Sequence, residues 1–209
     1  QFQSDLQRMS KIMGALAANV GVKLDVGGEK LFVVDERGHV LDNMTVSLLM
    51  TELALYANPG KPIVLPVTLP NAFATVAGWH NAPIIETKGD FRSLMQATPN
   101  VLLALDGSGQ FLFPDFLPAP DGLMATVRLL EWLSVRGMKI SEVTRYLPAS
   151  SMAFERIAAP WEIKGGLMRR PAPTAPCTTY ACESYPYCPR RKGHRGLAET
   201  PRRRRGHWE

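Results

Sequence analysis

The sequence predicts an α/β protein in which layers of a mixed, mainly parallel sheet are flanked by helices. Four apolar runs of strand length alternate with segments whose apolar residues recur at helical spacing. The runs lie at residues 31–35, 63–67, 83–87 and 101–105. Such alternation is typical of a mostly parallel sheet. Ligands of these sheets usually bind at loops that follow strand ends, and two loops have that place, after Leu24 and after Leu105.

The first 40 residues are expected to form a helix and two strands. Apolar residues at helical spacing predict a helix over residues 4–20, which ends near a glycine. A short strand at 22–25, a turn with two adjacent glycines and a strongly apolar strand at 31–35 follow. The turn at 36–39 is hairpin-like, so the chain resumes the strand direction at Val40.

From there to residue 146 the chain alternates between helix and strand. Asp42 or Asn43 can cap the next helix, Asn71 can cap another, and Asp121 opens a long one. Phe111 begins a stretch that extends away from the loop after the fourth apolar run. Helices are expected at about residues 42–56, 72–80, 90–97, 121–136 and 141–146.

The tail differs from the body in charge and composition. Residues 1–168 contain 14 Lys and Arg against 16 Asp and Glu, whereas residues 169–209 contain 10 against 3, together with all three cysteines. Leu197 is the only Leu, Ile, Val or Phe of that tail. Because such a stretch cannot bury enough apolar surface to offset its ordering entropy, we expect disorder beyond about residue 170.

Several classes of function are disfavoured by composition. No apolar run is long enough to cross a bilayer, so no membrane partner is expected. The cysteine-free body and the lack of a signal sequence are consistent with the cytoplasm. The tail cysteines lack the close pair of common zinc folds, and the run Arg202–Arg205 predicts only non-specific binding, so a nucleic-acid partner is not favoured. The sequence begins without Met, which suggests that the natural N-terminus lies upstream.

Three segments together carry a more specific pattern. The first is Asp25-Val26-Gly27-Gly28-Glu29-Lys30 followed by an apolar strand, the second is Asp106-Gly107-Ser108-Gly109-Gln110, and the third runs from Phe113 to Leu123 into a leucine-rich helix. In this order and spacing they resemble the α-D-phosphohexomutase family, which includes phosphomannomutase and phosphoglucomutase. The first segment occupies the place of that family's metal loop, and the second resembles its sugar-recognition loop.

The resemblance implies a domain division. Residues 1–30 would end the family's second domain, 31–150 would form its third α/β domain, and 151–170 would lead toward a C-terminal domain. Residues 171–209 would be a basic, Pro- and Arg-rich tail outside the family pattern. A shifted reading frame in a GC-rich gene would also produce such a tail, and another frame of the gene would then continue the family pattern after Arg170.

The resemblance also implies ligands and site residues. A hexose 1-phosphate would be contacted by Asp106, Ser108 and Gln110, and by the basic residue Lys88. Asp25 and Glu29 remain as two of the family's metal-binding carboxylates, so a Mg²⁺ site would be degenerate and loosely held. Structural alternatives to a binding role stay open. Both segments can be ordinary glycine-bearing turns, and Lys88 can be a solvated side chain. His39 and His80 are expected to be surface residues.

The resemblance extends to a variant group of bacterial proteins. In them a sugar-1-phosphate nucleotidyltransferase, often a mannose-1-phosphate guanylyltransferase, is fused to a mutase-like region with a Gly-Gly-Glu metal loop. The sequence has no Ser-His-Asn-Pro-like phosphoserine loop, so phosphoryl transfer by this chain alone is not expected. Three hypotheses remain open: a mutase-like region of such a fused protein, a fragment of an active phosphohexomutase, and a non-catalytic interaction module with a basic nucleic-acid-binding tail.

Overall fold

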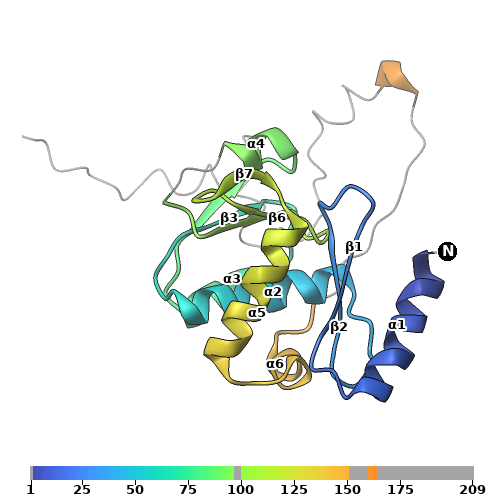
Figure 1. The fold of residues 1–209 in the computed structure, drawn as a ribbon. Coiled ribbons are helices and arrows are strands. Elements are labelled where there is room, and N and C mark those ends of the chain that lie inside the picture. Colours follow the sequence, from blue (N-terminus) through green and yellow to red (C-terminus); the bar gives the residue numbers. More distant parts are fainter. Residues whose placement is uncertain (1, 97–99, 151–159, 164–209) are drawn as a thin grey trace, which may run out of the picture. The chain divides into compact units, whose positions relative to one another are not determined.

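A computed structural model describes residues 2–96, 100–150 and 160–163 (Figure 1). The chain forms two compact units, residues 1–153 and 154–209, and of the second unit only residues 160–163 are described. The predicted linker and tail therefore lie almost wholly outside the described residues. The first unit contains α1 (Phe2–Leu16), β1 (Gly21–Leu24), β2 (Leu31–Val34), α2 (Asn43–Ala57), β3 (Ile63–Pro66), α3 (Ala72–Trp79), β4 (Ile84–Thr87), α4 (Phe91–Met95), β5 (Leu103–Leu105), β6 (Phe111–Phe113), β7 (Leu117–Pro120), α5 (Gly122–Arg136) and α6 (Ile140–Tyr146).

The main sheet has five strands in the order β4-β3-β5-β6-β7. β3 runs parallel to both β4 and β5, whereas β6 and β7 complete the sheet in antiparallel pairs. The predicted α/β class with a mixed sheet and flanking helices is confirmed. Because β3, β4 and β5 are parallel, the loops that follow them leave from the same edge of the sheet.

Alternation along the strands divides the core into two layers. Ile63 and Leu65 of β3 pack into a large cluster with residues of α2, α3, α5 and α6, whereas Val64 between them belongs to a smaller cluster with Leu94 of α4. The same division holds in β5 and β6, since successive side chains of a strand point to opposite faces. Side chains of α2, α3, α5 and α6 thus pack on one face of the sheet, and among the described residues the five-residue α4 is the one helix that packs on the other.

The hairpin of β1 and β2 forms a separate two-stranded sheet beside the main one. An isolated hairpin is marginally stable in water, so it needs further packing. Leu6 and Met13 of α1 pack against Val34 of β2, and Ser10 of α1 donates a hydrogen bond to the carbonyl of Gly38. The predicted boundary between residues 30 and 31 falls within this hairpin; the domain division stays a prediction.

The helix α2 begins at a side-chain cap that the sequence predicts. Asp42 Oδ1 accepts hydrogen bonds from the backbone N–H groups of Met44 and Thr45, both at 3.0 Å. Burial by itself would raise the pKa of the Asp42 carboxyl, but these bonds and one from the Thr45 hydroxyl outweigh it and lower the pKa. The cap therefore stabilises the fold above the ordinary Asp pKa and is lost as the pH falls through the lower, folded-state value.

Replacing Asp42 with alanine is expected to lower the free energy of unfolding by about 1 kcal/mol at neutral pH, since one capping side chain is lost. The difference from the unsubstituted chain should shrink as the pH falls below the ordinary Asp pKa and through the lowered folded-state pKa of Asp42. Urea unfolding at several pH values measures it. Asn71→Ala is the control, because Asn71 holds the same position before α3 without a side-chain cap; an equal loss in both variants would contradict the assignment.

A buried carboxylate joins the ends of four helices. Glu52 of α2 is 2% exposed, and its Oε2 lies 2.7 Å from Nε2 of His80, which follows α3. Its Oε1 accepts a hydrogen bond from the Tyr146 hydroxyl of α6 at 2.9 Å and lies 3.6 Å from Arg136 of α5. The Arg136 guanidinium stacks 3.8 Å from the ring centre of Tyr56. Burial raises the pKa of the Tyr146 hydroxyl, which keeps it a donor to Glu52.

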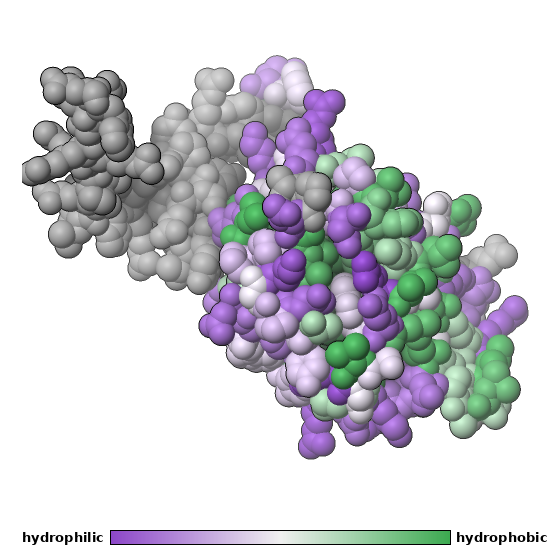
Figure 2. All heavy atoms as spheres, turned by 60° about the vertical axis from the view of Figure 1, so that its left-hand side comes forward, coloured by the Kyte–Doolittle hydropathy of each residue, from purple (hydrophilic) through white to green (hydrophobic). Residues whose placement is uncertain are grey.

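The surface of this unit is polar with apolar side chains interspersed. On the face in Figure 2, hydrophilic residues occupy most of the surface, and apolar ones gather toward the right-hand side. Leu123, Val127 and Leu130, spaced along α5, are about half exposed or more. Within the described part of the chain, no helix combines the length and apolar character needed to span a membrane.

Candidate functional site

The turn that joins β1 to β2 is organised by Asp25. Its Oδ1 accepts hydrogen bonds from the backbone N–H groups of Glu29 and Lys30, at 2.8 and 3.0 Å. Gly28 lies in the turn with φ of +71°, a conformation that favours glycine. The turn is therefore closed by the carboxylate itself, which leaves Oδ2 without a hydrogen bond among the described residues.

The two carboxylates of this turn converge on Gly27. A Cβ atom added to Gly27 would lie 3.8 Å from Asp25 Oδ2 and 3.8 Å from the carboxyl carbon of Glu29. Both acidic side chains therefore lie within 4 Å of the same point, which a Cβ on residue 27 would occupy. Asp25 is half-buried and Glu29 is exposed, so the convergence lies at the surface.

The loop after β5 is a second turn closed by its own aspartate. Asp106 Oδ1 accepts a hydrogen bond from the Ser108 N–H at 2.8 Å, and Oδ2 accepts one from the Ser108 hydroxyl at 2.6 Å. Gly107 and Gly109 both have positive φ, at +80° and +94°. Carboxylate and hydroxyl are thus held side by side, half-buried, where they can exchange hydrogen bonds with the adjacent hydroxyls of a ligand.

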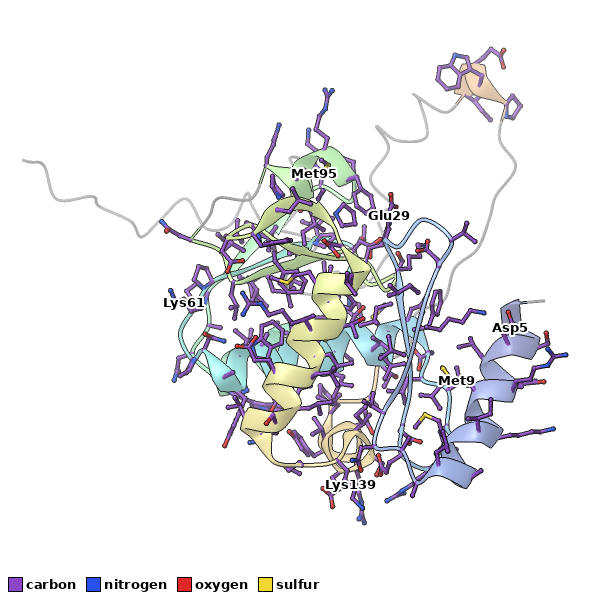
Figure 3. All side chains as sticks on the ribbon, viewed as in Figure 1. Asp5, Met9, Glu29, Lys61, Met95 and Lys139 are labelled. Carbon is purple, nitrogen blue, oxygen red and sulfur yellow. The ribbon has the colours of Figure 1, made fainter. Side chains whose placement is uncertain are left out.

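The structure brings these two turns together. The side-chain Nε2 of Gln110 donates a hydrogen bond to Glu29 Oε2 at 3.1 Å, and the backbones of Lys30 and Gln110 form an antiparallel bridge. The Leu31 N–H also donates to the Gly109 carbonyl at 2.9 Å. Figure 3 shows Glu29 at the end of the β1–β2 hairpin that approaches the main sheet. Residues some 80 positions apart in the sequence therefore form one continuous surface.

Lys88 lies on the same edge, two strands away. It follows β4, and Asp106 follows β5, with β3 between them. Neighbouring strands are about 4.8 Å apart, so these two loops leave the sheet roughly 10 Å from each other. Lys88 is exposed and extends the polar edge by a positive charge, and the contacts between the two turns described above do not involve it.

Sequence reasoning missed the loop that fills the space between Lys88 and Asp106. Thr68, after β3, lies beside Gly89, because a Cβ there would be 3.6 Å from its hydroxyl oxygen. Leu69 approaches Gly107 closely, with 2.6 Å to an added Cβ. The signal was available, since the apolar run at 63–67 predicts a strand whose following loop shares this edge.

Two hollows in the described surface differ in their relation to these residues. One, of about 410 Å³, lies beside Lys88 and is lined also by Thr87, Ser93 and Gln96. The other, of about 290 Å³, lies at the amino ends of the strands between Lys61 and Arg128, and it contains none of the predicted site residues. Of the predicted site residues, Lys88 alone lines the first hollow.

The carboxylates at Gly27 fit a weakly held cation. Mg²⁺ is usually bound by one or two carboxylates together with waters and substrate phosphates. Asp25 and Glu29 each have one oxygen engaged by an N–H donor, which leaves one oxygen apiece for a cation. No group of three or more His, Cys, Asp or Glu side chains able to hold a metal is found among residues 2–96, 100–150 and 160–163.

Replacing Gly109 with alanine is expected to cost clearly more stability than replacing Gly60. Both residues have positive φ, so either change incurs about 1–2 kcal/mol of backbone strain. At Gly109 the added Cβ would also lie 3.1 Å from the Leu31 carbonyl, in the contact between the two turns, whereas at Gly60 it would meet nothing within 4 Å. If Gly109→Ala and Gly60→Ala lowered the free energy of unfolding equally, the contact between the two turns would be able to accommodate the added methyl group.

Comparisons with known proteins agree with one another. A family model described as "Phosphoglucomutase/phosphomannomutase, alpha/beta/alpha domain III" matches residues 42–151. A phosphoglucomutase/phosphomannomutase of Thermococcus kodakarensis is 28% identical over 150 residues, which cover 70% of this chain and 32% of that protein. A phosphoglucosamine mutase of Nitratidesulfovibrio vulgaris is 28% identical over 134 residues, which cover 62% of this chain and 30% of that protein.

A solved structure is similar as well. A phosphoglucomutase/phosphomannomutase family protein from Burkholderia thailandensis has a TM-score of 0.60 and 26% identity, with 71% of this chain and 33% of that chain covered. The chain thus spans about a third of the length of the relatives that it matches.

Proposed function

This chain belongs to the phosphoglucomutase/phosphomannomutase family, and from that premise we propose that residues 1–150 form the sugar-recognising part of a sugar-phosphate protein. The observation that carries the proposal is the hydrogen bond between Gln110 and Glu29. It joins the turn at 25–30 to the turn at 106–110, and these are the two turns that resemble the family's metal loop and sugar-recognition loop. The proposed ligand is a hexose 1-phosphate. It would lie along the edge from Lys88 to the turn at 25–30.

Each side chain has a separate part in this binding. The Asp106 carboxylate accepts hydrogen bonds from sugar hydroxyls, and the Ser108 hydroxyl can both donate and accept. The Lys88 ammonium attracts the phosphate as a point charge. Asp25 and Glu29 would hold a divalent cation, which supplies neutralisation of phosphate charge when bound. Gln110 links the loop at 106–110 to the carboxylates of the turn at 25–30 through its hydrogen bond to Glu29.

The proposal assigns binding to this chain and leaves phosphoryl transfer to other parts of a complete protein. The sequence contains no phosphoserine loop, so a nucleophile is not supplied by these 209 residues. Interconversion of glucose 1-phosphate and mannose 1-phosphate with their 6-phosphates is therefore not expected from the chain by itself. If the full-length gene product has mutase activity that Asp25→Ala abolishes, the chain belongs to an active phosphohexomutase.

Calorimetric titration of the full chain with glucose 1-phosphate and mannose 1-phosphate tests the proposal. Asp106→Ala should weaken binding about tenfold or more, since hydrogen bonds to a charged group contribute about 1.5–3 kcal/mol. Asp115→Ala is the matched control, because Asp115 is a half-exposed carboxylate paired with Arg128 away from this edge. Binding that Asp106→Ala leaves unchanged, or that Asp115→Ala removes, would contradict the proposed site.

A finer proposal concerns the parent protein. The loss of an acidic side chain at Gly27 favours the variant in which a mutase-like region is fused to a sugar-1-phosphate nucleotidyltransferase. The relatives described above are named as mutases, and their names mention no nucleotidyltransferase. The DNA sequence around this reading frame distinguishes the two kinds of parent protein. An upstream nucleotidyltransferase domain would support the fusion, and an upstream phosphoserine loop would support a mutase.

A further inference from the structure

We propose that Gln110 is a positioning residue, whose side-chain amide orients the Glu29 carboxylate and makes the loop at 106–110 and the turn at 25–30 respond as one unit. This inference rests on the proposed function of the site. It assigns Gln110 a role through Glu29 rather than through contact with a sugar. The role follows from where the amide lies and what it touches.

Burial separates the two partners. Gln110 is 7% exposed and immediately precedes β6, so its side chain leaves a fixed backbone. Glu29 is exposed on a hairpin turn, where a long side chain without a partner would sample several rotamers. The hydrogen bond of 3.1 Å from Gln110 Nε2 to Glu29 Oε2 therefore restricts the exposed Glu29 side chain to fewer rotamers, because the buried Gln110 side chain is itself fixed.

The carboxylates of the turn are oriented in the same manner. Asp25 has Oδ1 fixed by two backbone N–H donors, and Glu29 has Oε2 fixed by the Gln110 amide. Each keeps its second oxygen, and both groups flank the Gly27 position. Carboxylates that ligate metals are commonly oriented by such donors behind them, and loss of the donor typically lowers metal affinity about 10–100-fold.

Backbone contacts make the coupling direct. Lys30 and Gln110 are paired, so a shift of either turn must move the other. The Gly122 N–H at the start of α5 donates to the Gly28 carbonyl at 2.7 Å, and a Cβ on Gly122 would lie 2.7 Å from the same oxygen. The turn is thus held from two sides, by the sugar loop and by the helix. The Gln110 amide is the side-chain link whose removal leaves this backbone frame in place.

A double-mutant cycle tests the inference, with Mn²⁺ alone as the probe and water-proton relaxation as the readout. Gln110→Met keeps the length of the side chain and removes the donor; Glu29→Gln removes the charge. In a Gly27→Asp background, chosen to strengthen binding, Gln110→Met should weaken Mn²⁺ binding about tenfold. It should have no further effect once Glu29→Gln is present. Equal effects in both backgrounds would overturn the positioning role.

A second measurement does not depend on any ligand. In two-dimensional amide NMR of the full chain, Gln110→Met should shift the resonances of the turn at 25–30, and Glu29→Gln those of the loop at 106–110. Unchanged resonances in the opposite turn would overturn the coupling. If both turns respond but hexose phosphates do not bind, the proposed function fails while the coupling stands, so the two failures are distinguishable.

Discussion

Replacing Gly27 with aspartate is expected to raise the affinity of the chain for Mn²⁺ and Mg²⁺ by about tenfold or more, because cation affinity rises with the number of carboxylate ligands. The new side chain would start beside both Asp25 and Glu29, where its Cβ makes only ordinary contacts of 3.7–3.8 Å. Without a cation, three converging carboxylates repel one another, so the variant should unfold more easily in a chelator and recover when Mn²⁺ is added. Thermal unfolding with and without Mn²⁺ measures both effects.

Gly28→Asp is the control for net charge, compared by Mn²⁺ affinity and not by stability, because Gly28 has φ of +71° and a side chain there is strained. It adds the same charge one position later, but a Cβ at Gly28 meets nothing within 4 Å. Because a side chain there would start farther than 4 Å from both carboxylates, its effect on Mn²⁺ binding should be small. If both variants gained affinity equally, net charge alone would explain the result and the convergence on Gly27 would be contradicted.

Replacing Glu52 with alanine is expected to lower the free energy of unfolding by about 3–5 kcal/mol, since removal of one partner leaves a buried network uncompensated. Arg136 and His80 would lose their shared carboxylate, and the Tyr146 hydroxyl its acceptor. A loss of this size is a large part of the roughly 5–15 kcal/mol that stabilises a typical domain. Urea unfolding followed by circular dichroism gives the difference.

Glu131→Ala serves as the comparison for Glu52. Glu131 is also a helical glutamate in an ion pair, with Arg128, but its side chain is 51% exposed. Exposed pairs contribute little, so its loss should stay within about 0.5–1 kcal/mol. Should Glu52→Ala prove as mild as Glu131→Ala, the cluster would have no role in holding the ends of α2, α3, α5 and α6 together.

The regular elements could largely be predicted because their signals are local. The apolar run at 63–67 became β3, and the capping side chain of Asp42 begins α2 as expected. β7 was missed, since Leu117–Pro120 contains two prolines, which argue against a central strand. It is one of the two edge strands of the sheet, where a missing backbone donor is tolerated.

Contacts between distant residues could not be read from the same signals. His80 was expected at the surface, and this was wrong: its side chain is 14% exposed, because it turns inward to a carboxylate 28 positions away. His39 is 72% exposed, as expected. A position at a helix end predicts neither the packing of the next helix nor a buried partner, so the Glu52 network became visible only in three dimensions.

The candidate site lies between these extremes. Position after strand ends and family resemblance pointed to Asp25, Glu29, Asp106, Ser108 and Gln110. The sequence did not reveal that the Gln110 amide bonds to Glu29, because that contact depends on how the hairpin packs against β6. Their roles in binding remain predictions.

If the turns at 25–30 and 106–110 form one binding edge for a hexose phosphate, one ligand must affect both of them. Titration of the ¹⁵N-labelled full chain with glucose 1-phosphate, followed by amide NMR, tests it most directly. The amides of both turns and of Lys88 should shift together along one saturation curve. Shifts confined to the amino ends of the strands around Lys61, or to one turn without the other, would contradict it.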